Sequence, residues 1–114
     1  MASRGRGARN KGANFERELA KYFNANVDGM KAQRGLGQCR GGGEEIADVE
    51  IELIHIEAKR HKRCLIKAAL DQAINDCQNK DKLPVAITKD DRKPILVTML
   101  LDDWIKLFKA YAEK

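Results

Sequence analysis

The stretch IADVEIELIHIEAKRHK, residues 46–62, decides the fold of this chain. Over residues 49–53, apolar and acidic side chains alternate with a period of two, which is typical of a half-buried strand. The alternation continues over residues 54–59, but its parity changes where Leu53 and Ile54 adjoin. A tight turn or bulge is therefore expected there, and the segment is predicted to form a hairpin with one apolar face and one densely charged face.

Elements before and after the hairpin complete a layered pattern. Asn14 is a candidate cap for an amphipathic helix whose apolar stripe is formed by Phe15, Leu19, Tyr22 and Phe23. The other predicted elements are a short strand over 30–34, a helix over 65–78, strands over 83–88 and 95–99, and a final helix opening at Asp102 or Asp103. The order α-β-ββ-α-ββ-α predicts an α/β fold, a single compact domain with a central mixed β-sheet flanked by helices.

The final helix carries an apolar stripe of its own. Its members are Trp104, Ile105, Phe108 and Tyr111. Large apolar side chains at helical spacing usually enter the core of their own domain, and we expect these to do so. The same stripe would also suit a contact with a second copy of the chain.

Length and composition bound the class of protein. The chain has 114 residues, 43% of them hydrophobic and 34% charged, which suits one domain with one core. It contains no run of about 18 apolar residues that would span a membrane, and no apolar signal segment is recognised near its start. Its three cysteines, Cys39, Cys64 and Cys77, are an odd number without a Cys-x-x-Cys pair, so a reducing cytoplasm is the expected location.

Positive charge is concentrated in the first third of the chain. Residues 1–40 hold nine basic and three acidic side chains, whereas the rest holds thirteen basic and fourteen acidic ones. A second basic cluster lies at 59–63. This distribution favours a nucleic-acid partner, although a solvated basic surface is an alternative explanation.

Two segments are expected to lack a packed core. Residues 1–12 hold four basic side chains and little to bury, so they are predicted to form a flexible basic arm ahead of a domain over residues 13–114. The stretch from Gly35 to Gly43 contains five glycines and is predicted to be a mobile loop. Because no Gly-Lys-Ser/Thr follows, it is not a P-loop, and no nucleotide cofactor is expected.

The charged face of the hairpin carries the residues best suited to catalysis. Glu57 and Lys59 leave the same face of a strand, and a tight hairpin would place Asp48 beside Glu57. Two carboxylates, with the Ala58 carbonyl, supply hard oxygen ligands for Mg²⁺, which lowers the pKa of a bound water and polarises a phosphate. Lys59 would orient that water and offset the charge that grows on phosphorus. A solvent-exposed face on which Glu57 pairs with Lys59 or Arg60 explains the residue types equally well.

Two motifs, in this order, resemble a known superfamily. Asp48 followed by IHIEAK (residues 54–59) is similar to the Asp…Glu-x-Lys core of the PD-(D/E)xK nucleases. KGANFEREL (residues 11–19) is similar to the first helix of archaeal-type Holliday junction resolvases. Ala47 stands where the superfamily pattern has proline, and the gap between Asp48 and Glu57 is shorter than in cellular resolvases. So compact a version looks like a phage-encoded member.

The resemblance implies a restriction-endonuclease-like fold and a set of roles. The implied catalytic residues are Glu16, Asp48, Glu57 and Lys59. The implied metal ligands are Asp48, Glu57, Glu16 and the Ala58 carbonyl, for Mg²⁺ with Mn²⁺ able to substitute. Gln72 is a possible accessory residue, whereas His55 is expected to be solvated.

The resemblance also implies a DNA-binding surface. Arg34 precedes the glycine-rich loop, where an arginine contacts DNA in the family. Phosphate contacts that position the DNA without reading its sequence are expected from Arg4, Arg6, Arg9, Lys11, Arg17, Arg34, Arg40, Lys62 and Arg63.

The expected function is that of a Mg²⁺-dependent, structure-selective endonuclease that resolves four-way DNA junctions by paired nicks. A junction has twofold symmetry and the chain offers one site, so a homodimer is expected. Two alternatives stay open: another superfamily nuclease of the restriction or flap-cleaving type, and a basic nucleic-acid-binding protein without catalysis. No membrane partner is expected, and a phage-encoded protein would act in the cytoplasm of its bacterial host.

Overall fold

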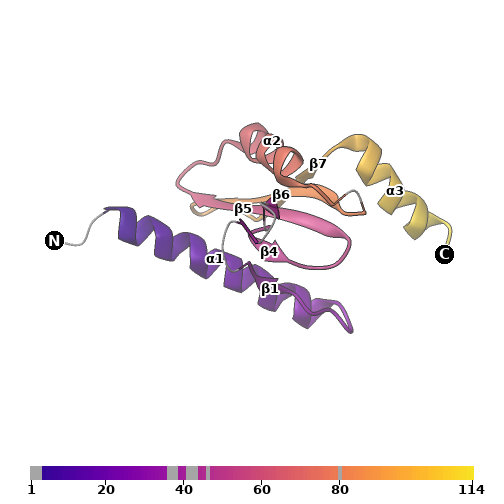
Figure 1. The fold of residues 1–114 in the computed structure, drawn as a ribbon, viewed down its shortest axis with the longest axis horizontal. Coiled ribbons are helices and arrows are strands. Elements are labelled where there is room, and N and C mark those ends of the chain that lie inside the picture. The colour runs from indigo at the N-terminus through magenta and orange to yellow at the C-terminus, as the bar shows by residue number, and fades with distance from the viewer. Residues whose placement is uncertain (1–3, 36–38, 41–43, 46, 80) are drawn as a thin grey trace.

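A mixed β-sheet lies between two helices, which cover opposite faces, and a further helix extends from the end of the last strand (Figure 1). These coordinates are a computed structural model that describes residues 4–35, 39–40, 44–45, 47–79 and 81–114. The helices are α1 (Arg4–Asn26), α2 (Ile66–Asp76) and α3 (Leu101–Ala112). Within the described residues, no helix has the length and apolar content needed to cross a lipid bilayer.

The sheet has the strand order β1-β4-β5-β6-β7. Its strands are β1 (Gln33–Arg34), β4 (Val49–Glu50), β5 (Ile54–His61), β6 (Leu83–Asp90) and β7 (Leu96–Met99). β5 and β6 are parallel, and the other neighbours are antiparallel. This architecture confirms the predicted single α/β domain with a mixed sheet and is consistent with the restriction-endonuclease-like fold.

The predicted hairpin is formed by β4 and β5. Val49 lies opposite Ile56 and Glu50 opposite His55. The turn between the strands passes through Leu53, whose φ of 77° lies in the left-handed region that favours glycine. The Leu53 carbonyl accepts a hydrogen bond from the Leu83 N–H at 2.9 Å, which joins this turn to the start of β6.

The main core lies between α1 and the sheet. The apolar stripe of α1 supplies Phe15 and Leu19, which are 1% and 3% exposed. They pack on the apolar face of the hairpin and of β6, formed by Val49, Ile51, Ile56, Ala58, Val85 and Ile87. Alternation with a period of two therefore selects this face of the strands for burial, as the sequence predicts.

The opposite face of the sheet is covered by α2 rather than by solvent. α2 contributes the small buried residues Ala69 and Ala73 and packs against β5 and β6. Glu57 is 4% exposed and His55 5%, so the expectation that His55 is solvated is wrong. The charged face of the hairpin is thus enclosed between strand and helix, where the unbalanced charge of a carboxylate is expensive.

The start of the chain differs from the expectation. α1 begins at Arg4, so Asn14 lies inside the helix and does not cap it. Residues 4–12 form the first turns of α1 instead of an irregular arm. The division of the chain into a basic arm and a nuclease domain stays a prediction.

Part of the glycine-rich segment contains strands where a loop was predicted. β2 (Cys39–Arg40) pairs antiparallel with β3 (Glu44–Glu45) in a separate two-stranded sheet. The predicted mobility of Gly35–Gly43 falls partly outside the described residues.

The last helix does not enter the core, which corrects the sequence-based expectation. None of the residues of α3, all of them described, is buried. Trp104, Phe108 and Tyr111 are 46%, 50% and 75% exposed, and the Trp104 and Phe108 rings stack on each other with centroids 5.1 Å apart. A single residue, Leu100, joins β7 to α3, and its carbonyl accepts the Trp104 N–H at 2.9 Å. Because this connection is so short, the helix continues away from the sheet (Figure 1).

Candidate active site

Asp48 lies where the chain enters the hairpin. Its N–H donates to the Ile56 carbonyl at 3.0 Å, and its own carbonyl accepts the Gly35 N–H at 2.8 Å. Its carboxylate Oδ2 accepts the Ala58 N–H at 2.9 Å. Backbone bonds on both sides therefore hold this carboxylate against the middle of β5.

Glu57 is the buried partner of Asp48. The register places it next to the Val49–Ile56 pair, across from Asp48, and the two side chains are hydrogen-bonded. Burial raises the pKa of Glu57 to about 7, and the neighbouring Asp48 carboxylate adds to the rise while Lys59 opposes it. Two carboxyl groups this close disfavour double ionisation, so the pair attracts a proton or a cation.

Lys59 connects this carboxyl pair to a pocket at the surface. Its Nζ lies 3.2 Å from the Glu57 Oε1, and its side chain is 32% exposed. A pocket of about 340 Å³ opens beside it, lined by Gly12, Ala13, Glu16, Arg34, Asp48, Ala58, Lys59, Arg60 and His61. Lys59 therefore contacts a buried acid and a solvent-filled space at the same time.

Glu16 reaches the same pocket from α1. Its carboxylate accepts a hydrogen bond from the Arg34 Nε at 2.7 Å, and its side chain is 17% exposed. Burial raises the pKa of Glu16, an effect that Arg34 counteracts and Asp48 reinforces. Arg34, which the resemblance implied as a DNA contact, thus fixes the position of Glu16.

The donor set fits a cation that needs few protein ligands. Among the described residues, no three His, Cys, Asp or Glu side chains are close enough to share a metal ion. Zn²⁺ in proteins takes three or four side-chain ligands, whereas Mg²⁺ keeps several waters and needs one or two carboxylates. Asp48 and Glu57, with the Ala58 carbonyl, match the second pattern, and a cation would balance their adjacent charges. Glu16 stands apart from this pair because its carboxylate is bonded to Arg34.

The predicted DNA-binding residues are placed in different ways. Lys62 and Arg63 line a hollow that adjoins the pocket. Lys11 is bonded to Asp91 at 2.9 Å, and Arg17 to Asn14 at 3.1 Å. The side chains of the other predicted contacts lie outside the described part of the chain, namely those of Arg4, Arg6, Arg9 and Arg40.

α2 brings the predicted accessory residue to the other side of Lys59. Gln72 and Lys59 line one hollow of about 270 Å³, together with His61, Arg63, Leu65, Ala68 and Ala69. Parallel pairing of β5 with β6 requires a crossover connection, and α2 is that connection. The helix therefore crosses the face on which Lys59 lies.

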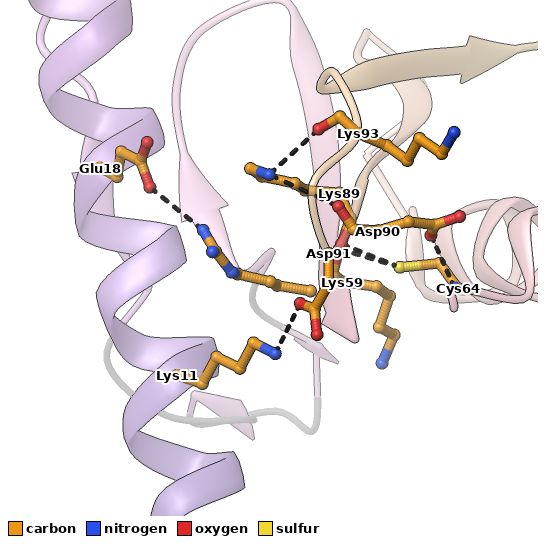
Figure 2. A network of polar contacts seen from close by, with 9 residues as sticks. Lys11, Glu18, Lys59, Cys64, Lys89, Asp90, Asp91 and Lys93 are labelled. Carbon is orange, nitrogen blue, oxygen red and sulfur yellow. Dashed lines mark hydrogen bonds and ion pairs between the residues drawn. The ribbon is translucent and has the colours of Figure 1, made fainter. Parts of the chain in front are cut away.

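Sequence reasoning missed the contribution of the turn between β6 and β7. Its residues Asp90, Asp91 and Lys93 line the hollow next to Lys62 and Arg63, and Asp91 binds Lys11 of α1 (Figure 2). The parallel register pairs His61 with Asp90, which brings this turn to the end of β5. A parallel pairing over so long a separation leaves no local signal in the sequence.

Comparisons with known proteins point to one family. A family model described as "Phage putative PDDEXK endonuclease" matches residues 7–114, nearly the whole chain. Comparisons with curated proteins and with solved structures gave no match. The matched region contains all of the residues that line the pocket beside Lys59.

Proposed function

Because this chain belongs to the family of phage PDDEXK endonucleases, we propose that it is a Mg²⁺-dependent, structure-selective DNA endonuclease that resolves four-way junctions by paired nicks. The family makes it a nuclease of the PD-(D/E)xK type. The observation that carries the proposal is the contact of Asp48 with a buried Glu57 whose other neighbour is Lys59, beside a pocket with a basic rim.

Each residue of the group has a distinct task in phosphodiester hydrolysis. Asp48 and Glu57, with the Ala58 carbonyl, would hold Mg²⁺, and Mn²⁺ would substitute. When bound, the ion supplies a water of lowered pKa and a positive charge beside the phosphate. Lys59 orients the water and stabilises the negative charge that develops in the transition state. Glu16, held by Arg34, adds a further acceptor at the wall of the pocket.

The surface around the pocket supports a polyanionic substrate. Arg60 and His61 belong to the pocket, and Lys62 and Arg63 follow directly on the same strand end. α1 approaches with Lys11, four residues after the last of three arginines near its start. Contacts of this kind bind phosphates without reading bases, which suits an enzyme that recognises the shape of a junction.

A homodimer follows from the twofold symmetry of the junction, and α3 is the surface that favours it. Its exposed apolar residues are Leu101, Trp104, Ile105, Leu107, Phe108 and Tyr111. The apolar surface continues over the edge strand β7, where Leu96 and Val97 are 48% and 63% exposed. Monomeric proteins rarely leave so large an apolar surface in water. An isologous contact through this surface would give each junction two active sites.

The decisive experiment compares DNA substrates of different shape. A labelled four-way junction is incubated with the protein with and without Mg²⁺, beside a flap, a nicked duplex and a linear duplex, with Asp48→Asn as the inactive control. We expect Mg²⁺-dependent, symmetry-related nicks in the junction and little cutting of the linear duplex. Preferred cutting of the flap or the linear duplex would assign another nuclease activity. Binding without cutting in either metal would indicate a non-catalytic DNA-binding protein and overturn the proposal.

The proposed site of action is the cytoplasm of the bacterial host. Phage DNA replicates there, and branched DNA is the substrate that the enzyme would meet. No nucleotide cofactor enters the proposed reaction.

A further inference from the structure

Three adjoining hollows form one trough along the ends of β5 and β6. The first is the active-site pocket, and the second, which shares Lys59 and His61 with it, extends to α2. The third, of about 760 Å³, shares His61 and Arg63 with the second and is lined by His61, Lys62, Arg63, Asp90, Asp91 and Lys93. The trough therefore leads from the catalytic carboxylates past Lys59 to the β6–β7 turn.

The two acids in the third hollow are already engaged by other groups. The Asp90 Oδ1 accepts the Cys64 N–H at 2.7 Å, and this bond lowers the pKa of Asp90. The Asp91 Oδ1 accepts a hydrogen bond from the Lys11 Nζ at 2.9 Å, which lowers the pKa of Asp91 (Figure 2). These carboxylates therefore hold the turn and α1 in place and do not pair with Lys62, Arg63 or Lys93.

The turn itself presents two cations that bind nothing else in the described part of the chain. The Lys93 N–H donates to the Asp90 carbonyl at 3.1 Å, and the Lys89 Nζ donates to the Lys93 carbonyl at 3.0 Å, so the backbone of the turn is closed from both sides. The side chains of Arg92 and Lys93 are exposed and have no hydrogen-bond or ion-pair partner among the described residues.

Arg92 occupies a backbone position that suits glycine better. Its φ of 62° lies in the left-handed region, where a side chain with a Cβ is strained. Residues that keep such strain cluster at sites where the side chain has a function. At the tip of this turn, the feature that distinguishes arginine from glycine is a cation that projects into solvent.

We propose that the β6–β7 turn, residues Asp90–Lys93, is a clamp for the DNA backbone. Arg92 and Lys93 bind phosphates on one side of the trough, and Lys62 and Arg63 bind phosphates on the other. The ligand is the phosphodiester chain that flanks the cleaved bond, held without regard to base sequence. This inference rests on the proposed function, because it takes the DNA strand to enter the trough at the active-site pocket.

The test uses one double variant and one matched control. Arg92→Gly with Lys93→Ala removes both cations of the turn, and Arg92→Gly relieves the strained backbone, so the variant should melt no lower than the wild type. Lys109→Ala with Lys114→Ala removes two cations from the exposed C-terminal end of the chain, away from the residues that line the trough. Affinity for a fluorescent four-way junction is measured by anisotropy in Ca²⁺ over a series of NaCl concentrations.

The expected result follows from counterion release. Each lost phosphate contact lowers the slope of log K against log salt by about 0.9, so two lost contacts lower it by about 2 and weaken binding on the order of 50-fold at 0.1 M salt. The control should keep the wild-type slope, and single-turnover cutting by the turn variant at saturating DNA should stay within about twofold of wild type, since the removed groups do not touch the reacting atoms.

The outcomes separate the clamp from the activity. A turn variant with the slope of the control would overturn the clamp, even if the wild-type enzyme cuts junctions. A wild-type protein that binds junctions without cutting them would overturn the proposed function, while a reduced slope in the turn variant would still support the clamp. Absence of DNA binding by the wild type would overturn both.

Discussion

Glu57→Gln should stabilise the metal-free protein at alkaline pH while abolishing cleavage. Glu57 is 4% exposed, and burial, with a contribution from Asp48, raises its pKa to about 7. At pH 8 the folded protein must therefore keep an ionised carboxylate in a site that disfavours it. Glutamine has nearly the same shape and carries no charge, and its amide N–H can donate to Asp48 as the protonated carboxyl group does.

The magnitude follows from proton linkage. Because the pKa of Glu57 is higher in the folded state than the ordinary value of 4.5, the folded state binds the proton more tightly, and stability falls as the pH rises from 4.5 to about 7. A difference of about 2.5 pKa units corresponds to about 3 kcal/mol at pH 8. Below about pH 5 the carboxyl group is protonated in the folded protein, and the remaining difference is under about 1 kcal/mol.

Urea unfolding in EDTA at pH 5 and pH 8 measures this effect. The control is Glu52→Gln, which makes the same chemical change at an exposed position of the same hairpin and should alter stability by less than about 0.5 kcal/mol. At pH 8, Mg²⁺ should stabilise the wild type and leave Glu57→Gln unchanged. A Glu57→Gln protein that is no more stable than wild type at pH 8 would refute the reasoning, because it would mean that the buried carboxylate is not under electrostatic strain.

Three further predictions concern the active site and the dimer. Asp48→Asn should reduce single-turnover cleavage in Mg²⁺ by at least about 10³-fold with an unchanged circular dichroism spectrum, because the amide oxygen still accepts the Ala58 N–H but binds Mg²⁺ poorly; near-normal cutting would remove Asp48 from the site. Lys59→Ala should slow cutting by about 10²-fold or more while junction affinity in Ca²⁺ changes little, and equal losses of binding and cutting would make Lys59 a phosphate ligand rather than a catalytic residue. Phe108→Asp should convert a dimer into a monomer in light scattering, whereas Ala110→Asp on the opposite side of α3 should not, and a wild-type protein that is monomeric with and without DNA would contradict the dimer.

The hairpin and the carboxylate pair could be predicted from local sequence. Period-two alternation determines which residues share a face, and the adjoining Leu53 and Ile54 locate the turn that sets the register. Once that register is set, Asp48 must lie across from Glu57, and Lys59 must follow on the same face. These relations span about a dozen residues, so they do not depend on how the rest of the chain packs.

Contacts between distant segments were decided by the tertiary structure alone. The parallel pairing of β5 with β6 places the β6–β7 turn beside Arg63 and Asp91 beside Lys11, which is 80 residues away in the chain. The pairing of Arg34 with Glu16 depends in the same way on how β1 meets α1. Such pairs are set by helix and strand docking, which the period of a single segment does not encode.

The same division explains the two errors of burial. Periodicity correctly marks an apolar face on α3 and a polar face on the hairpin, but it does not say what will cover either face. α2 lies on the polar face, which buries His55 and Glu57 and raises the pKa of Glu57, whereas the one-residue connection after β7 carries α3 away from its own sheet. Sequence by itself therefore determined the catalytic pairing and the amphipathic character of each element. Only the tertiary structure decided which faces are buried, because burial depends on the neighbour that each face meets.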